Sequence, residues 1–306
     1  MLILAEAVHE DHGRRFLVPA QLDTMSPQWI HRRNYTSTAV RVERVGVEQG
    51  RPGRMNEAVE SYFVCATPRT GSSLLIGLLD STGVCGRPQS YFRAPDELLW
   101  AERWRLGPAP SYADFMRAAR AAGSTPNGVF GAKLMWGTLG EVVDKLRTVH
   151  RDLAGDDLGL LHRAFGRAGF VYLARRDVVA QAVSWLRAEQ TGTWFVGGNG
   201  EISGDGGGNG REPVFDAGAI RRLISTIEEH NAAWQAWFAA CGIRPHRVFY
   251  EDLERDVVAV TRGVVEFLGI TVPDQGPPIV ARHQRQADEI NKRWIKQYRV
   301  LSERFS

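Results

Sequence analysis

Short apolar runs alternate along most of this chain with longer segments in which apolar residues recur every three or four positions. The runs are short and apolar enough to be strands buried in a parallel sheet, at 62–67, 129–134, 170–173 and 247–250. The longer segments have helical spacing, at 71–81, 140–149, 177–189, 217–240 and 257–268. The alternation predicts an α/β domain with a mostly parallel central sheet flanked by helices.

Two parts of the chain lack this alternation. Residues 1–58 contain only scattered apolar residues, so we treat them as a poorly defined amino-terminal extension and assign 59–306 to one main domain. The extension has three possible interpretations: a small β-appendage, a loosely ordered arm, or a segment that precedes a true start at Met55. The segment 196–211 is rich in glycine, and such long loops are either plain insertions or cover a site.

Composition narrows the class of protein without identifying a ligand. The chain has 306 residues, of which 43% are hydrophobic and 24% charged, as in ordinary globular proteins. A net charge of +3 permits an anionic ligand but does not indicate a nucleic-acid surface. The three cysteines form no C-x-x-C pair, and no apolar stretch is long enough to span a membrane or to act as a signal peptide. We therefore expect a cytoplasmic protein with reduced thiols.

The stretch ATPRTGSSLL, at 66–75, joins the first predicted strand to the first predicted helix. A loop in this position presents unpaired backbone N–H groups and the positive end of a helix dipole. Gly71 allows the backbone to approach a ligand closely, and Arg69 adds a planar positive charge. A nucleoside triphosphate loop would read G-x-x-x-x-G-K-[ST], and this stretch lacks the first glycine and the lysine. The stretch predicts an anion site, with a plain strand-to-helix turn as the alternative.

A second candidate anion site lies in YLARRDVVAQAVSWLRAEQ, residues 172–190. Arg175 and Arg176 follow a predicted strand, and Ser184 lies two turns into the next predicted helix. An arginine and a serine that face the same way can bind a phosphate through charge and through a hydroxyl hydrogen bond. Two anion sites at the carboxyl ends of parallel strands favour a nucleoside with phosphate-like groups at both ends.

These two stretches together resemble the signature elements of the sulfotransferases, and most closely the bacterial carbohydrate sulfotransferase family typified by trehalose 2-sulfotransferase. Further blocks that look like those of the family follow in the same order: STGVCGRPQSYF, TPNGVFGAKLMW, RRDVVAQAVSWLRAEQT, FDAGAI and RQADEINKRWIKQYR. The resemblance covers about residues 61–299. It implies a P-loop-like three-layer fold, a homodimer, and transfer of a sulfuryl group from 3′-phosphoadenosine 5′-phosphosulfate (PAPS) to a hydroxyl of a carbohydrate or glycolipid-type acceptor.

The resemblance also implies roles for the residues of both stretches. The first loop would bind the 5′-phosphosulfate, and Arg69 would stabilise the charge that develops on the leaving phosphate. Arg175, Arg176 and Ser184 would bind the 3′-phosphate, and it is open which arginine makes the direct contact. No metal ion is implied. The residues implied for the first loop are Thr67, Pro68, Arg69, Thr70, Gly71, Ser72 and Ser73.

The acceptor hydroxyl should lose its proton to a general base, and the sequence departs from the family here. The position of the family's glutamate matches Ser90, in PQSYF, and a serine is a poor base at neutral pH. Asp96 and Glu97 are close enough in the chain to substitute, unless they are ordinary surface acids. Slow transfer without a strong base is also open, because a loose transition state asks little of the nucleophile.

Candidate acceptor contacts lie next to the proposed cofactor elements, because aromatic faces suit sugars and flat acceptors. They are Gln89, Ser90, Tyr91, Phe92, Lys133, Trp136 and Trp194, with Trp185 in the same region. The chain has nine tryptophans, so many of them must simply belong to the core. Arg285 could add a positive charge beside the cofactor, and is otherwise an ordinary surface arginine.

Two other functions stay open. A P-loop nucleotide phosphotransferase, such as a kinase, would require Mg²⁺ and would bind ATP. A degenerate, non-catalytic homologue would bind the nucleotide without transferring sulfate, an alternative that Ser90 motivates.

Overall fold

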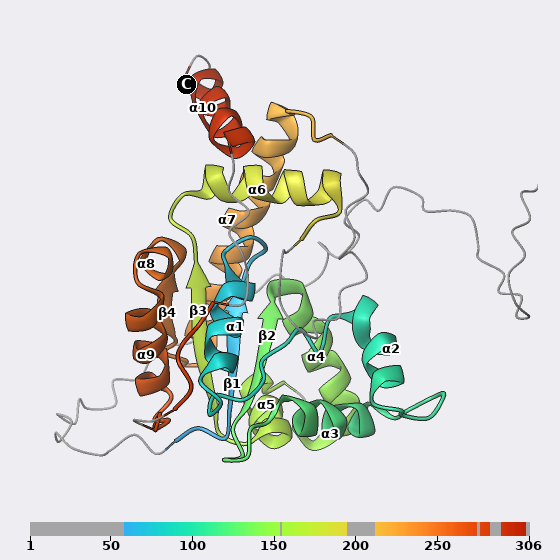
Figure 1. Ribbon diagram of the computed structural model, residues 1–306. Helices are drawn as coiled ribbons and strands as arrows, with labels where there is room; N and C mark the ends of the chain where they lie inside the picture. Colours follow the sequence, from blue (N-terminus) through green and yellow to red (C-terminus); the bar gives the residue numbers. More distant parts are fainter. Residues whose placement is uncertain (1–57, 154, 195–211, 274–275, 282–288, 304–306) are drawn as a thin grey trace, which may run out of the picture. The chain divides into compact units, whose positions relative to one another are not determined.

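The structure is a computed structural model that describes residues 58–153, 155–194, 212–273, 276–281 and 289–303. Within these ranges the chain forms an α/β domain (Figure 1). The extension 1–57, the glycine-rich segment 196–211 and Arg285 lie outside the described residues, so the expectations for them stay predictions.

Four parallel strands form the central sheet, in the order β2-β1-β3-β4. They are β1 (Ser61–Ala66), β2 (Phe130–Met135), β3 (Ala168–Ala174) and β4 (His246–Phe249). All six residues of β1 are buried, as expected for a strand with neighbours on both sides and helices on both faces. Because β1 and β3 are adjacent and parallel, the segments that follow them leave the same edge of the sheet. This arrangement brings the two predicted anion elements together.

The helices that cover the sheet are mostly short. In chain order they are α1 (Ser72–Ser81), α2 (Ala94–Arg103), α3 (Tyr112–Gly123), α4 (Trp136–Val149), α5 (Asp157–Phe165), α6 (Val178–Thr191), α7 (Ala217–Ala240), α8 (Tyr250–Arg255), α9 (Val257–Phe267) and α10 (Glu289–Glu303), with a short 3₁₀ turn at Arg151–Leu153. None of the helices in the described ranges is long and apolar enough to cross a membrane.

Helices pack on both faces of the sheet and so make a three-layer domain. The odd-numbered β1 side chains Phe63 and Cys65 belong to a core cluster shared with α3, α4, α5 and α7. The even-numbered side chains Tyr62 and Val64 belong to a second cluster, shared with α1, α8 and α9. Successive strand residues point to opposite faces, so one strand supplies both cores. The predicted three-layer α/β fold with a parallel sheet is confirmed.

A third apolar cluster lies among α6, α7 and α10. Trp185 and Leu186 of α6 pack there with Ile227 of α7 and Trp294 of α10. Figure 1 shows α6 running across the carboxyl ends of the strands. The apolar side of α6 is therefore covered by α7 and α10, and its polar residues are left to contact the loop that follows β1.

Candidate active site

The loop between β1 and α1 has a backbone conformation that is uncommon for residues with a side chain. Arg69 has φ 67° and Gly71 has φ 83°, so both lie in the left-handed region. Glycine adopts this region at little cost, whereas Arg69 adopts it only because its surroundings hold it there. A turn of this kind carries the chain from the strand into α1 and leaves successive N–H groups on one side.

The amino terminus of α1 has no side-chain cap. Gly71 is its N-cap residue, makes no capping hydrogen bond, and is followed by no acidic residue in the first turn. Of the other helices, α3, α5, α6, α7 and α9 are each capped by the side chain of a serine or an aspartate, whereas α2, α4 and α8 are not. The backbone N–H groups of the first turn of α1 are thus available to an anion, and the helix dipole favours negative charge there.

Tyr250, the first residue of α8, packs against the loop. A Cβ atom added to Gly71 would lie 2.5 Å from Cδ2 of Tyr250, so only glycine fits under the ring. The guanidinium of Arg175 lies 4.5 Å from the centroid of the same ring, within the range of a cation–π contact. Tyr250 therefore packs against Gly71 and holds Arg175 over its ring.

The side chain of Arg69, in the first predicted anion element, reaches the second. Its Nε donates a hydrogen bond of 3.0 Å to Oγ of Ser184, and its Nη1 donates to the carbonyl oxygen of Trp194. Burial, together with the positive charges of Arg175 and Arg187, lowers the pKa of Arg69 from 12.5 to about 10. A half-buried cation with two cationic neighbours is stabilised by a bound anion, because the anion offsets their mutual repulsion.

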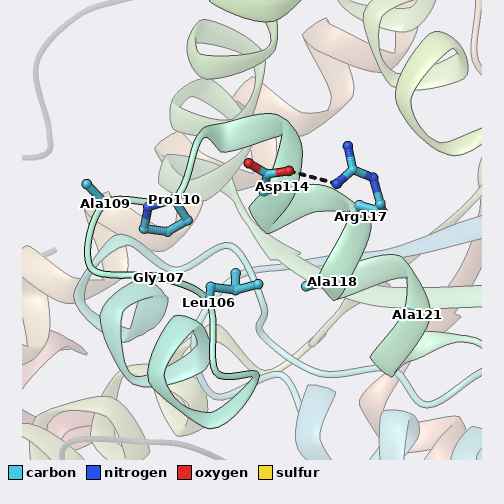
Figure 2. Close-up of a pocket in the computed structure, with 8 residues that line it drawn as sticks. All are labelled: Leu106, Gly107, Ala109, Pro110, Asp114, Arg117, Ala118 and Ala121. Carbon is cyan, nitrogen blue, oxygen red and sulfur yellow. Dashed lines mark hydrogen bonds and ion pairs between the residues drawn. The ribbon is translucent and has the colours of Figure 1, made fainter.

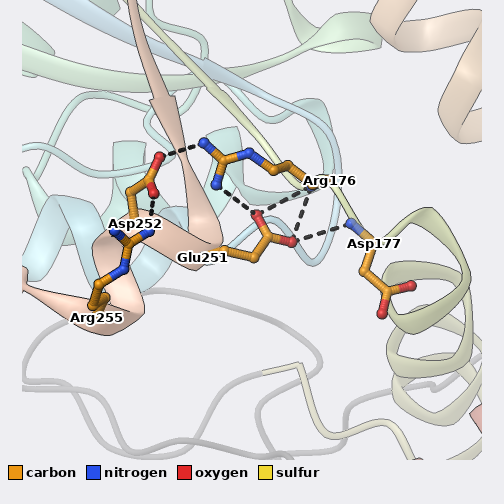
Figure 3. A network of polar contacts seen from close by, with 5 residues as sticks. All are labelled: Arg176, Asp177, Glu251, Asp252 and Arg255. Atoms are coloured by element: carbon orange, nitrogen blue, oxygen red, sulfur yellow. Dashed lines mark hydrogen bonds and ion pairs between the residues drawn. The ribbon is translucent and has the colours of Figure 1, made fainter.

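The two consecutive arginines after β3, Arg175 and Arg176, have different contacts. Arg175 is directed at the loop: its Nη1 lies 3.5 Å from the carbonyl oxygen of Arg69, and its buried Nε has no hydrogen-bond partner among the described residues. Figure 3 shows Arg176 engaged instead with carboxylates of α8, at 2.6 Å from Oδ2 of Asp252 and 3.9 Å from Oε2 of Glu251. Arg175 therefore has the free donor that an added phosphate would need.

Arg176 also has a structural role that accounts for its position. Its guanidinium lies 4.1 Å from the ring centroid of Phe249, and its backbone N–H donates to the Glu251 carboxylate at 3.0 Å. The Asp252 hydrogen bond raises the pKa of Arg176, and Arg176 in turn lowers the pKa of Asp252. These contacts fasten the end of β3 to the start of α8, at the exposed side of the domain.

On the other side of β1, the segment with Ser90 runs beside the end of β2. Gln89 forms a parallel bridge with Ala132, and its carbonyl oxygen accepts the N–H of Lys133 at 3.0 Å. The Lys133 side chain reaches towards α1, with Nζ 3.4 Å from Oγ of Ser73. Lys133 thus points towards the anion loop, and Ser90, which follows Gln89 in the chain, is half-buried. The assignment of these residues to acceptor binding stays a prediction.

The acidic residues proposed as substitute bases are both in ion pairs. Asp96 is buried and accepts two hydrogen bonds from Arg93, at 2.9 and 3.1 Å. Glu97 forms an ion pair of 2.5 Å with Lys145 on α4. The role of Glu97 as the base stays a prediction.

The aromatic candidates are largely packed against other protein groups. Tyr91 and Phe92 are 2% and 0% exposed and belong to the core beside α3 and β2. Trp185 is buried in the cluster under α10. Trp136 and Trp194 are half-buried, and Trp136 packs edge-on against Trp234 with ring centroids 5.2 Å apart. Of the five, Trp136 and Trp194 keep partly exposed surface, and the Trp194 carbonyl oxygen accepts from Arg69 of the anion loop.

A separate hollow lies between α3 and the loop that precedes it, and shares no residue with the anion loop (Figure 2). It is lined by Leu106, Gly107, Ala109, Pro110, Asp114, Arg117, Ala118 and Ala121. Asp114 and Arg117 form an exposed ion pair of 2.7 Å at its rim. No cluster of three or more potential metal-ligating side chains occurs among the residues that the structure describes.

Three residues of the site were not identified from the sequence: Tyr250, Gln181 and Arg187. Tyr250 follows β4, whose carboxyl end lies at the same edge of the sheet as the loop, so its position was accessible from the strand pattern. Gln181 and Arg187 are spaced by three residues on either side of Ser184 on α6. Because residues three apart share a helix face, this polar stripe was the signal that could have identified them.

Known proteins resemble this chain over nearly the whole described domain. The family model for the Stf0 sulphotransferases matches residues 61–300. Trehalose 2-sulfotransferase of Mycobacterium tuberculosis is 32% identical over 273 residues, which cover 82% of this chain and 98% of that protein. The enzyme of the same name from Mycolicibacterium smegmatis is 30% identical over 292 residues, with the same coverage.

One solved structure with similarity to the chain is the sulfotransferase domain of the olefin synthase from Synechococcus PCC 7002. It is 16% identical, with a TM-score of 0.38 and coverage of 82% of this chain and 98% of that domain. The family assignment does not depend on it. Because the family model spans most of the domain and the two relatives align over nearly their full length, the chain belongs to the Stf0 sulphotransferase family and is a sulfotransferase.

Proposed function

We propose that the protein transfers the sulfuryl group of PAPS to a hydroxyl group of a carbohydrate or glycolipid-type acceptor. The observation that carries the proposal is the 3.0 Å contact between Arg69 Nε and Ser184 Oγ. It joins the loop proposed for the 5′-phosphosulfate to the helix proposed for the 3′-phosphate. The two elements are thus within the reach of one nucleotide, as a donor phosphorylated at both ends requires.

The residues present fit such a donor. The uncapped amides of α1 and the hydroxyls of Ser72 and Ser73 suit the 5′ group, which carries charge next to the transferred sulfur. Arg175, with an unpartnered buried Nε, and Ser184 suit the 3′-phosphate. The donor supplies an activated sulfuryl group when bound, and the protein's task is to position the acceptor and stabilise the leaving phosphate.

In the transfer, Arg69 has the central role. Its guanidinium already lies between the loop and α6, where it can donate to the oxygen on which negative charge develops as the sulfur–oxygen bond breaks. Lys133, beside Ser73, is a second cation at the same end of the loop. A cation fixed before the reaction lowers the barrier more than one that must move into place.

The acceptor is proposed from the relatives, both of which are named as trehalose 2-sulfotransferases. Trehalose, a disaccharide rich in hydroxyls, is therefore the first acceptor to test. Trp136 and Trp194 have exposed surface that could stack on a sugar ring, and Ser90 lies beside Lys133 on the acceptor side. Ser90 stands where the family pattern has its glutamate. We therefore assign proton removal to Glu97, with slow transfer without a strong base as the alternative.

The decisive experiment measures binding of 3′-phosphoadenosine 5′-phosphate (PAP) and of ADP in the presence of EDTA. A ligand at 100 times its Kd stabilises a fold by about 2.7 kcal/mol, which raises the Tm of a domain of this size by about 5 to 10 °C. We expect PAP to do so without metal and ADP to bind at least tenfold more weakly. Equal binding of ADP, or a requirement for Mg²⁺ with ATP, would reject the proposal in favour of a nucleotide phosphotransferase.

The two arginines after β3 provide a matched pair of variants for the same assay. Arg175→Ala removes a cation directed at the loop, and a charge-assisted hydrogen bond contributes about 1.5–3 kcal/mol, so PAP affinity should fall roughly 10- to 150-fold. Arg176→Ala removes a cation engaged with Asp252 and should change PAP affinity less than fivefold. The reverse order would assign the 3′-phosphate to Arg176.

A degenerate homologue is the remaining alternative, motivated by Ser90. It would bind PAP but transfer no labelled sulfate from PAPS to trehalose or to other sugars and glycolipids. The proposed homodimer and the proposed cytoplasmic location rest on the family resemblance and on sequence composition, and light scattering of the purified protein tests the first.

A further inference from the structure

A buried amide contacts the backbone of the anion loop. Gln181 of α6 is 0% exposed, and its Nε2 donates to Oγ1 of Thr67 at 2.8 Å and to the carbonyl oxygen of Pro68 at 2.7 Å. Its Oε1 is also buried and has no hydrogen-bond partner among the described residues. A buried amide with one unsatisfied oxygen is unfavourable for stability alone, so its position points to another role.

The hydrogen bonds of the loop carbonyls share one feature. The carbonyl oxygen of Thr67 accepts from Oγ1 of Thr70 at 3.0 Å, and that of Pro68 accepts from Gln181. The carbonyl oxygen of Arg69 lies 3.5 Å from Nη1 of Arg175. Three successive carbonyls are thus each directed at a donor from the protein. In contrast, the N–H groups of the first turn of α1 have no backbone hydrogen bond among the described residues before that of Leu75 to Gly71.

This division of donors and acceptors is what an anion-binding loop requires. A carbonyl oxygen that turned towards a phosphate would repel it, so the carbonyls must point elsewhere while the N–H groups converge. Holding them there also forces Arg69 into its left-handed conformation, which an arginine would not adopt alone. Gln181 is the contact that fixes the middle carbonyl of the three.

Thr67 ties the same contact to a second helix. Its Oγ1 accepts from Gln181 and lies 3.5 Å from Oδ1 of Asn231 on α7. Gln181 and Ser184 are three residues apart on α6, so one helix face contacts both the backbone of the loop and the Arg69 side chain.

We propose that Gln181 is a positioning residue for the sulfuryl donor: it orients the Pro68 carbonyl away from the anion and so presets the loop amides. The proposal rests on the proposed function, because it assumes a phosphate-bearing donor at this loop. Gln181 does not itself contact the donor; it acts through the backbone of Thr67 and Pro68.

The test compares Gln181→Leu and Gln181→Met with the wild type, with Gln297→Leu on the exposed side of α10 as the matched control. Two hydrogen bonds are lost at the loop, so we expect PAP affinity to fall about 5- to 30-fold, with the KM for the acceptor unchanged. Exchange of the Leu75 amide, whose N–H donates to the Gly71 carbonyl oxygen at 3.1 Å, should accelerate at least tenfold, while exchange in α3 stays as in the wild type. Thr70→Val, which frees only the Thr67 carbonyl, should act in the same direction with a smaller effect.

Two measurements keep this inference separate from the proposed function. If the wild type does not bind PAP, the proposed donor is wrong, and the exchange rates still report whether Gln181 fixes the loop. If the wild type binds PAP and Gln181→Leu binds within twofold of it with unchanged loop exchange, Gln181 is not a positioning residue. A lower Tm without a change in PAP affinity or loop exchange would assign Gln181 to stability alone and overturn the proposal in the same way.

Discussion

At the residue scale, Gly71 is the residue of the site that least tolerates substitution. It has a positive φ of 83°, is the N-cap of α1, and lies under the ring of Tyr250. An added methyl group would meet Cδ2 of that ring at 2.5 Å, and the ring is itself held against Arg175 at 4.5 Å. Moving the ring would therefore displace a cation that the proposed function needs.

Gly71→Ala is expected to weaken PAP binding at least tenfold and to lower the free energy of unfolding by about 1–3 kcal/mol. The matched control is Gly140→Ala, inside α4, where an added Cβ meets no atom within 4 Å. Replacing a glycine inside a helix should stabilise the protein by roughly 0.5–1 kcal/mol. Calorimetric titration with PAP and urea unfolding of both variants check this, and wild-type affinity in Gly71→Ala would contradict the loop geometry.

At the residue scale, some features of the site could be predicted from the sequence and others could not. The chemistry of the first loop is contiguous in the chain, so the residues of the candidate anion site there could be named from local residue types. The contact of Arg69 with Ser184 depends on β1 and β3 being adjacent; the strand pattern predicts parallel strands but not their order. The choice between Arg175 and Arg176 could not be predicted, because it depends on the partners that α8 supplies from 75 residues further along the chain.

At the element scale, the strands and five of the helices were predicted within a few residues. The pattern missed α2, α3, α5, α8 and α10. In α2 the apolar residues are misleading, since Leu98 and Leu99 are 79% and 40% exposed. In α10 the buried residues Asn291, Trp294 and Tyr298 do have helical spacing, but one of the three is polar, which weakens the apolar pattern. The predicted start of α4 at 140 is also late, because the helix begins at Trp136 and includes Gly137, which resembles a turn residue.

The packing of α2 against α4 places a half-buried carboxylate between charges. Burial raises the pKa of Glu141 on α4, and the negative charge of Glu97 adds to this, whereas Lys145 and the Ala94 N–H oppose it. Between the unfolded pKa, near 4.5, and the higher folded pKa, the folded state binds more protons than the unfolded state. Stability therefore falls as pH rises through this window, and the loss persists at neutral pH.

Glu141→Gln removes the ionisation but keeps an oxygen that can accept from the Ala94 N–H. We expect the variant to melt about 2 °C higher than the wild type at pH 7, with the difference vanishing below about pH 4.5. Glu228→Gln, on the exposed side of α7, is the control and should show no such difference. Thermal melts from pH 4 to pH 8 make the comparison; a variant less stable than the wild type at pH 7 would mean that the Lys145 attraction outweighs burial.

At the scale of the whole molecule, different apolar clusters hold different parts of the site. The cores on both faces fix the strands, and the third cluster, of α6, α7 and α10, fixes the helix that contacts the loop. The site thus depends on α6 being held from its far side. Arg187 of α6 donates to Asn291 of α10 at 2.8 Å, which extends the polar stripe of α6 to the carboxyl-terminal helix.

The described domain begins with contacts just before β1. The N–H of Val59 donates to the carbonyl oxygen of Leu268 at 3.1 Å, and the N–H of Glu60 donates to that of Arg167 at 3.0 Å. The carbonyl oxygen of Glu60 accepts from Phe130 at 3.0 Å. These two residues connect the start of the sheet to three other segments of the chain. Their removal should therefore destabilise the whole domain.

We accordingly expect a chain lacking residues 1–57 to keep its Tm within about 2 °C and its affinity for PAP within twofold, because the contacts around β1 remain. A chain lacking residues 1–60 should melt at least 4 °C lower, since each lost backbone hydrogen bond costs about 0.5–1.5 kcal/mol. Differential scanning calorimetry and PAP titration of the two truncations test the boundary. Loss of PAP binding or of sulfate transfer in the shorter deletion would show that the extension contributes to the site, and the domain division at 58/59 would then be wrong.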